Sequence, residues 1–161
     1  MRLNLQTDLA LRMLIYLSVK QGAPATIQEI TQKMGLSQTH MMRVAAKLAS
    51  HGLVASNRGR NGGISLSRDA SEITVEEVVR AIEPDFALVQ CFDDSRERCV
   101  IEPACLLNGV LQSALDAFFT ELRSVTLAQL TVPNRYRLRQ ALRLAEPDES
   151  PAMPYATPQT S

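Results

Sequence analysis

The feature that most restricts the fold of this chain is a pair of short helices joined by a tight turn and followed directly by a glycine-rich hairpin. Thr26 is placed to cap the first helix, and Glu29, three residues later, would complete a capping box. Gly35 ends that helix and Ser37 caps the next one. Two capped helices around a glycine turn predict a helix-turn-helix over about residues 27–51.

The stretch that follows predicts a β-hairpin over about residues 53–67. Its strand candidates, residues 53–56 and 63–66, are joined by the run Asn-Arg-Gly-Arg-Asn-Gly, in which Asn-Gly is a strong turn signal. A hairpin in this place is the wing of a winged helix. We therefore predict a mainly α fold with a small β-hairpin. An ordinary surface hairpin with two solvated arginines is the alternative for the wing.

The second helix of the pair carries apolar residues at three- and four-residue spacing, which are expected to pack inward. Its outward face would then offer donors, acceptors and a methyl group to base edges in the major groove. Lys47 on the same helix suits a phosphate, and Arg58 and Arg60 in the wing suit a narrow minor groove. An exposed histidine, however, is more often solvated or bound to phosphate than a reader of bases. The predicted DNA-binding residues are Gln38, Thr39, His40, Arg43, Lys47, Arg58, Arg60, Asn61 and Gly62.

The net charge of zero hides an uneven distribution. Residues 1–70 contain nine Lys or Arg against three Asp or Glu, whereas residues 71–161 contain eight against fourteen. A basic first half could face phosphates. No stretch approaches the roughly 18–20 apolar residues of a membrane span, and the N-terminus lacks a signal-peptide pattern. A cytoplasmic protein that does not bind membranes is therefore expected.

Further helices are predicted over residues 7–21 and 74–82, before an irregular segment at residues 84–105. A long helix over residues 105–130 then carries apolar residues at three- and four-residue intervals. This apolar seam is longer than a small winged helix needs for its own core, so we predict a dimerisation helix; packing within the chain is the alternative.

The winged-helix regulator domain is thus expected to span residues 1–130. Residues 131–161 would form a C-terminal extension. From about residue 146 the extension is rich in proline and has no periodic pattern, which predicts a disordered tail.

Three cysteines, Cys91, Cys99 and Cys105, lie close together in a chain that has no others. An odd number argues against a disulfide framework, and thiolates bind zinc, copper(I) or iron–sulfur clusters. Zinc fits poorly because paired C-x2-4-C knuckles are absent, whereas a cluster could use three thiolates and one weaker ligand. Three unrelated reduced cysteines are the alternative. Without a C-x-x-C pair, a nucleophile–base set or a phosphate loop, the sequence gives no indication of an enzyme.

Motifs spread over residues 1–130 resemble the Rrf-two family of winged-helix transcription regulators. They include Arg-Gly-Arg-Asn-Gly-Gly in the wing, Val-Val-Arg-Ala-Ile-Glu-Pro, Pro-Ala-Cys-Leu-Leu and Thr-Leu-Ala-Gln-Leu. The resemblance implies a homodimer that binds an AT-rich palindrome of double-stranded DNA and holds an iron–sulfur cluster on Cys91, Cys99 and Cys105. In some relatives an aspartate from the first helix of the other subunit completes the coordination. Asp8 matches it; the alternative is a carboxylate favoured by the helix dipole.

Within the family, Leu-Val-Gln-Cys, Cys-Val-Ile-Glu-Pro-Ala-Cys and His-Met resemble the nitric-oxide-sensitive branch. This implies a repressor that releases DNA when nitric oxide reacts with its cluster. The gap between Cys91 and Cys99 is longer than is usual there and also occurs in iron-responsive repressors. A repressor that responds to iron or to cluster supply is therefore the alternative. Three cysteines with Asp8 favour a [4Fe–4S] cluster, with [2Fe–2S] possible.

Overall fold

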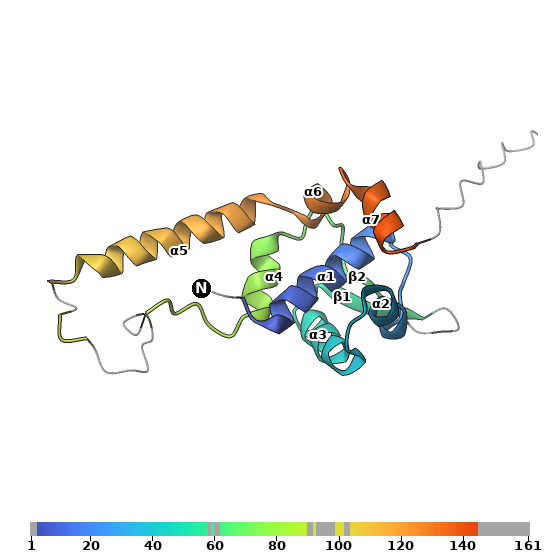
Figure 1. Cartoon of the computed structure of the whole chain (residues 1–161), viewed down its shortest axis with the longest axis horizontal. Coiled ribbons are helices and arrows are strands. Elements are labelled where there is room, and N and C mark those ends of the chain that lie inside the picture. The colour runs from blue at the N-terminus through green and yellow to red at the C-terminus, as the bar shows by residue number, and fades with distance from the viewer. Residues whose placement is uncertain are drawn as a thin grey trace, which may run out of the picture.

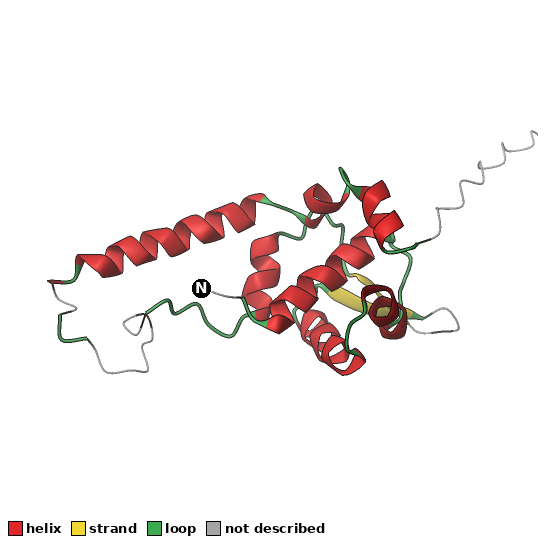
Figure 2. Cartoon of the chain, in the orientation of Figure 1, coloured by secondary structure: helices red, strands yellow, loops and turns green. Residues whose placement is uncertain are grey.

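The protein is described by a computed structural model over residues 3–57, 59, 62–89, 92, 99–101 and 104–144. Over these residues the chain is mainly helical and contains one two-stranded antiparallel sheet, so the predicted fold class is confirmed (Figures 1 and 2). The elements in chain order are α1 (Leu5–Val19), α2 (Ile27–Met34), α3 (Gln38–Ser50), β1 (Val54–Asn57), β2 (Gly63–Leu66), α4 (Val75–Ile82), α5 (Leu106–Ser124), α6 (Leu127–Thr131) and α7 (Arg135–Ala141).

The helix pair forms where its capping residues predict it. The Thr26 hydroxyl accepts a hydrogen bond from the Glu29 amide at 3.0 Å, and Gly35 ends α2 in the left-handed conformation, with φ of 65°. The Glu29 carboxylate, however, does not complete the predicted capping box. It accepts hydrogen bonds from Tyr16 Oη at 2.7 Å and from Lys20 Nζ at 2.8 Å, which ties α2 to α1. Ser37 precedes α3 as predicted, but its side chain makes no capping bond.

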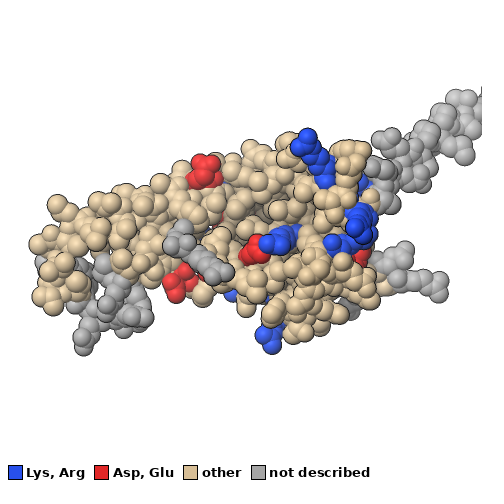
Figure 3. Space-filling model, in the orientation of Figure 1, with Lys and Arg blue, Asp and Glu red and all other residues tan. Residues whose placement is uncertain are grey.

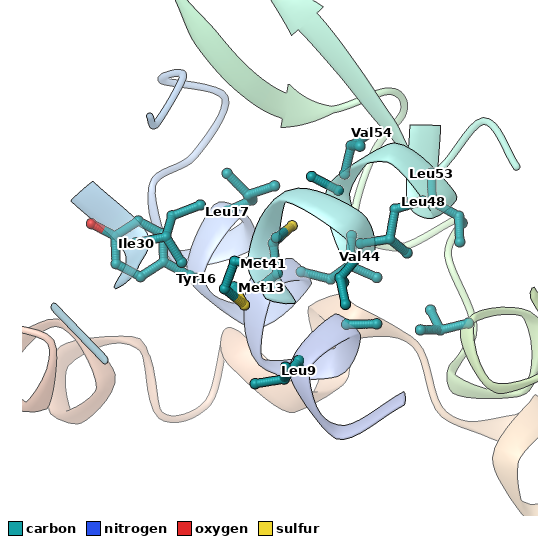
Figure 4. Packing of buried hydrophobic residues seen from close by; sticks show 14 of the residues in the cluster. Leu9, Met13, Tyr16, Leu17, Ile30, Met41, Val44, Leu48, Leu53 and Val54 are labelled. Carbon is teal, nitrogen blue, oxygen red and sulfur yellow. The ribbon is translucent and has the colours of Figure 1, made fainter. Parts of the chain in front are cut away.

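The core forms around α1, which lies between α3 and α6 and against α4 (Figure 1). Asn4 caps this helix by accepting a hydrogen bond from the Thr7 amide at 2.9 Å, so α1 starts two residues earlier than predicted. The inward face predicted for α3 is buried, as expected. It packs with buried residues of α1, α2 and the start of the wing in the main hydrophobic core. Figure 4 labels ten residues of this core: Leu9, Met13, Tyr16, Leu17, Ile30, Met41, Val44, Leu48, Leu53 and Val54.

The wing is attached to the loop before α2. Strands β1 and β2 pair antiparallel, with Val54 opposite Leu66, and Ala25 extends the sheet by one bridge. The Ala25 amide donates to Ile64 O at 2.9 Å, and the Ile64 amide donates to Ala25 O at 2.8 Å. A Cβ atom on Gly63 would lie 2.5 Å from Ala25 O, so this close approach requires glycine.

The helix predicted over residues 105–130 is broken in two, which corrects that prediction. Helix α5 ends at Ser124, Val125 is extended, and Thr126 caps α6 through a capping box with Gln129. The break has a long-range cause. The Val75 amide donates to Val125 O at 2.9 Å and the Leu127 amide donates to Ile73 O at 2.9 Å, so these residues pair with the segment before α4.

A buried carboxylate holds the C-terminal half of α5 against α4. Glu76, 7% exposed, accepts hydrogen bonds from Arg123 Nε at 2.6 Å and from Arg80 Nε at 2.8 Å. The Arg80 guanidinium also lies 3.6 Å from the centre of the Phe119 ring. The N-terminal half of α5 extends away from the rest of the chain (Figure 1).

Helix α7 lies within the predicted C-terminal extension and had no counterpart among the predicted elements. It packs against α1, and Leu142 and Leu144 beyond it contact the main core. The predicted disordered tail from about residue 146 lies outside the described residues. Across the described part of the chain, no helix is both long and apolar enough to cross a membrane.

Replacing Glu76 by Gln should lower the free energy of unfolding at pH 7 by about 1–2 kcal/mol, because two partly exposed arginines lose a charged acceptor. Hydrogen bonds from Arg123 and then Arg80 lower the pKa of Glu76 from 4.5 to about 2. A lowered pKa contributes stability that is present above pH 4.5 and is lost as the pH falls toward 2. Denaturant unfolding across this range should therefore show the two proteins converging. Glu72→Gln is the exposed control, and a pH-independent difference would contradict the assignment.

Replacing Gly63 by Ala should destabilise the fold by about 1–3 kcal/mol, because the new methyl group would collide with backbone atoms of Ala25. Thermal or denaturant unfolding measures this loss. Ser56→Ala, at an exposed position of β1, is the matched control and should have little effect. A Gly63→Ala protein as stable as the parent would show that the wing is not fixed to the loop before α2.

Candidate functional site

The outward face of α3 presents the side chains predicted to read DNA. Gln38, Thr39, His40 and Arg43 are all exposed, and α3 lies at the lower edge of the body in Figure 1. Met42 is also exposed, at 57%, and sequence reasoning missed it. The signal was available, because Met42 follows the buried Met41 and falls off the apolar face of the helix. An exposed thioether in this position can contact a thymine methyl group.

Beside this face lies a groove of about 440 Å³ between α3, the start of α1 and the end of α4. The groove is lined by residues of α3, of the N-terminal end of α1 with its cap, and of the segment after α4: His40, Arg43, Asn4, Gln6 and Pro84. The groove therefore joins the DNA-reading face to the element that carries Asp8 and to the beginning of the cysteine-bearing segment.

Lys47, predicted to contact phosphate, is engaged within the chain. Its Nζ atom donates a hydrogen bond to the carbonyl oxygen of Ile82 at 2.6 Å, and the side chain is half-buried. The ammonium thus lies at the C-terminal end of α4, where unpaired helix carbonyls favour a cation.

The described part of the wing forms a tight turn. The Gly62 amide donates to Gly59 O at 2.9 Å, and a Cβ atom on Gly62 would lie 2.6 Å from Asn57 O. Glycine at position 62 is therefore needed for the turn, whatever contact it also makes. The other predicted wing residues, Arg58, Arg60 and Asn61, lie outside the described residues.

Two of the three cysteines are described. Cys99 is exposed, Cys105 is half-buried, and both are free thiols. Cys105 immediately precedes α5, and its side chain makes no capping bond there. Cys91 lies outside the described residues, but its neighbour Phe92 packs against the apolar cluster between α4 and α5.

Asp8 lies in the first turn of α1, and its side chain is 47% exposed. Arg12, one turn later, binds the carboxylate through Nη2 at 2.9 Å and through Nε at 3.0 Å. Within the described residues, no three His, Cys, Asp or Glu side chains form a group that could hold a metal ion. The donor types do fit an iron–sulfur cluster, since thiolates are soft ligands and a carboxylate can serve as a weaker, harder fourth ligand.

Cationic side chains gather at the end of the molecule that carries the helix pair, whereas the far end of α5 shows none on the visible face (Figure 3). A groove of about 520 Å³ beside α2 contains four of them together with Glu29. None of the four is among the residues predicted to bind DNA, and two of them come from α7 and its C-terminal end. Arg139 is buried and Lys20 is paired with Glu29, so only part of this positive charge faces solvent. The four cations are Lys20, Lys33, Arg139 and Arg143.

Known proteins match this architecture. Residues 3–133 match the model of the Rrf2, or Rrf-two, family, described as an iron-dependent transcriptional regulator. The chain is 44% identical over 131 residues to the HTH-type transcriptional regulator NsrR of Oceanobacillus iheyensis, covering 81% of this chain and 89% of that one. It is 40% identical over 147 residues to the HTH-type transcriptional regulator NsrR of Bacillus subtilis, covering 91% and 100%.

Among solved structures, IscR of T. potens superposes with a TM-score of 0.65 at 21% identity, over 83% of this chain and 88% of that one, a likeness that concerns the fold. The family match covers the helix pair, the wing and α5 and confirms the resemblance seen in the sequence motifs. The chain belongs to the Rrf2 family of DNA-binding transcriptional regulators and is not an enzyme.

Proposed function

We propose that this protein is a cytoplasmic transcriptional repressor that senses nitric oxide through an iron–sulfur cluster and releases its operator when the cluster is nitrosylated. One observation carries the proposal. The free thiol of Cys105 lies directly before α5, whose N-terminal half leaves apolar side chains uncovered, and the free thiol of Cys99 lies six residues earlier. The chain is at least 40% identical to two regulators named NsrR. A change at the thiols therefore acts next to a surface suited to assembly.

The ligand set is Cys91, Cys99 and Cys105 of one subunit with Asp8 contributed by the other. Exposure of the Asp8 carboxylate on the first turn of α1 leaves it accessible to a second chain. Three thiolates with one carboxylate favour a [4Fe–4S] cluster, and [2Fe–2S] is the alternative.

Assembly as a homodimer is supported by the far half of α5. Leu106 is 87% exposed there, and Leu107 and Val110 are exposed on the same half of the helix. Apolar side chains left in water on a helix that extends from the body favour burial against a second copy. A two-fold dimer would present two α3 helices and so bind a palindromic operator.

On double-stranded DNA, four side chains of α3 would enter the major groove, because they are polar and exposed on its N-terminal half: Gln38, Thr39, His40 and Arg43. The wing, with Arg58, Arg60, Asn61 and Gly62, would follow the adjacent minor groove. Arginine inserted there favours the narrow groove of AT-rich sequence.

When bound, the cluster would supply iron that reacts with nitric oxide. Cys99 and Cys105 belong to the segment before α5, and Asp8 is part of α1. While these residues act as ligands, they would hold that segment against α1 of the other subunit. This fixes the two α3 helices about one DNA turn, roughly 34 Å, apart. Once the ligands are released, the helices no longer fit successive grooves. A coupling of about 3 kcal/mol would weaken binding roughly 150-fold.

A repressor that responds to iron or to cluster supply is the second candidate. The seven residues between Cys91 and Cys99 favour it, and the family is described as iron-dependent. A chelator, rather than nitric oxide, would then release the operator.

Protein purified without oxygen should contain about four iron and four sulfide ions per chain, and Cys99→Ala should lose them and bind operator about 100-fold more weakly. Metal and sulfide analysis, together with anisotropy of labelled operator, measures both effects. Ser113→Ala, on the exposed side of α5, is the control. Release by a chelator but not by nitric oxide would favour the second candidate. A Cys99→Ala protein that binds tightly and still responds to nitric oxide would refute the proposal.

Replacing Val110 by Lys should convert the dimer to monomers, because a charge would have to be buried in the apolar contact. Light scattering coupled to gel filtration measures the mass of the species. The control Gln112→Lys adds the same charge to the same helix at another exposed position and should remain dimeric. A dimeric Val110→Lys protein would show that the far half of α5 is not the contact.

A further inference from the structure

The last turn of α4 is a meeting point for three parts of the molecule. Ile82 and Glu83 are bonded to α3 and to α1, and Pro84 begins the segment that leads to the cysteines. In Figure 1, α4 lies between α5 and the ends of α1 and α3. Ile82 also belongs to the main hydrophobic core, and the polar bonds that Ile82 and Glu83 add at this turn can each be tested separately.

The contact to the recognition helix is made by Lys47. Its Nζ atom donates to Ile82 O at 2.6 Å, and Ile82 itself is fully buried. A carbonyl in the final turn of a helix has no partner within that helix, and a cation satisfies it while opposing the negative end of the dipole. The position of α3 is therefore fixed relative to the end of α4 by a charged hydrogen bond.

The contact to α1 is made by Glu83. One oxygen of its carboxylate, Oε2, accepts from Thr7 Oγ1 at 2.5 Å and from the Asn4 amide at 3.3 Å. Thr7 is fully buried, so this bond lies under the first turn of α1. The negative charge of Glu83 is also stabilised by the positive N-terminal end of the α1 dipole. The next residue along α1 is Asp8.

The segment beyond Pro84 is itself anchored on α5. Phe86 packs edge-on against Phe119, with ring centres 4.7 Å apart, and Leu88 and Phe92 join the same cluster. Two residues, Pro84 and Asp85, separate Glu83 from Phe86, so a movement near Cys91 that displaces Phe86 would reach Glu83 through a short stretch of chain. The groove of about 440 Å³ lies at this same place and is lined by Lys47, Ile82 and Pro84 among others.

We propose that Lys47 and Glu83 are positioning residues of a joint at the end of α4, through which the cysteine-bearing segment sets the position of the recognition helix of the same subunit. The inference rests on the proposed function and adds a route within each subunit to the spacing between subunits. It also assigns Lys47 to this joint in place of a phosphate contact.

The first test compares operator affinity of the full-length protein before and after nitric oxide treatment, over a series of salt concentrations. In the parent the ratio should be on the order of 100-fold. Lys47→Met should reduce it to below about 10-fold, with iron content and the salt dependence of binding unchanged. Lys47→Arg keeps a donor and should restore the ratio. Lys33→Met, which removes the matching bond from a lysine to Arg143 O, is the control and should keep it.

A contact between Lys47 and a DNA phosphate would give a different pair of results. If Lys47 binds phosphate, Lys47→Met should leave the ratio unchanged. It should also lower the slope of log affinity against log salt by about 0.9 for each phosphate that the variant no longer neutralises. That outcome would refute the proposed positioning role of Lys47.

The second test uses protein without a cluster, so that it does not depend on sensing. Glu83→Gln and Lys47→Met should each accelerate amide hydrogen exchange in the first turn of α1 and the last turn of α4, while Lys33→Met should not. Unchanged exchange in both variants would overturn the joint. A parent protein that ignores both nitric oxide and chelators would instead refute the proposed function, and the exchange rates would still decide the joint.

Discussion

The burial of α1 is the constraint on which the rest of the structure depends. Nine of its fifteen residues are buried, and α3, α4, α6 and α7 all pack against it. A helix covered on so many sides cannot shift without moving its neighbours, because protein interiors are close-packed. Polar bonds from Glu29 and Glu83 fix its two ends relative to α2 and α4. Helix α1 thus connects the helix pair and the wing to α4, and α4 in turn packs against α5.

Local signals in the sequence were sufficient for the helix pair. Caps and the turn glycine act over three or four residues, so Thr26 and Gly35 predicted α2 to the residue. The break between α5 and α6 could not be predicted in this way, because Val125 is held by residues 50 positions away in the chain. Helix α7 also escaped, since its short arginine-rich run has no apolar periodicity of its own and depends on packing against α1.

The residues of the candidate site were likewise predictable only where local sequence patterns determine them. The exposed residues of α3 were predictable, because an inward apolar face defines an outward one. Lys47 was not, since its carbonyl partner lies 35 residues further along the chain and charge alone suggested a phosphate. For Asp8 the sequence supplied a family resemblance, and the structure adds an accessible carboxylate paired with Arg12. Its proposed role depends on a second chain, which no pattern within one chain can reveal.

The uncovered half of α5 has a consequence for the life of the protein in a cell. Residues 106–115 contain no charged side chain, and Leu106, Leu107 and Val110 face water in a single chain. Stability gained by covering them depends on the concentration of chains. A newly made chain at low copy number would spend longer with this helix bare, open to proteases and to other apolar surfaces. The number of copies in the cell would thus influence how fast each chain is degraded. As copies are lost, a larger fraction of the remaining chains would be unpaired and exposed to proteases.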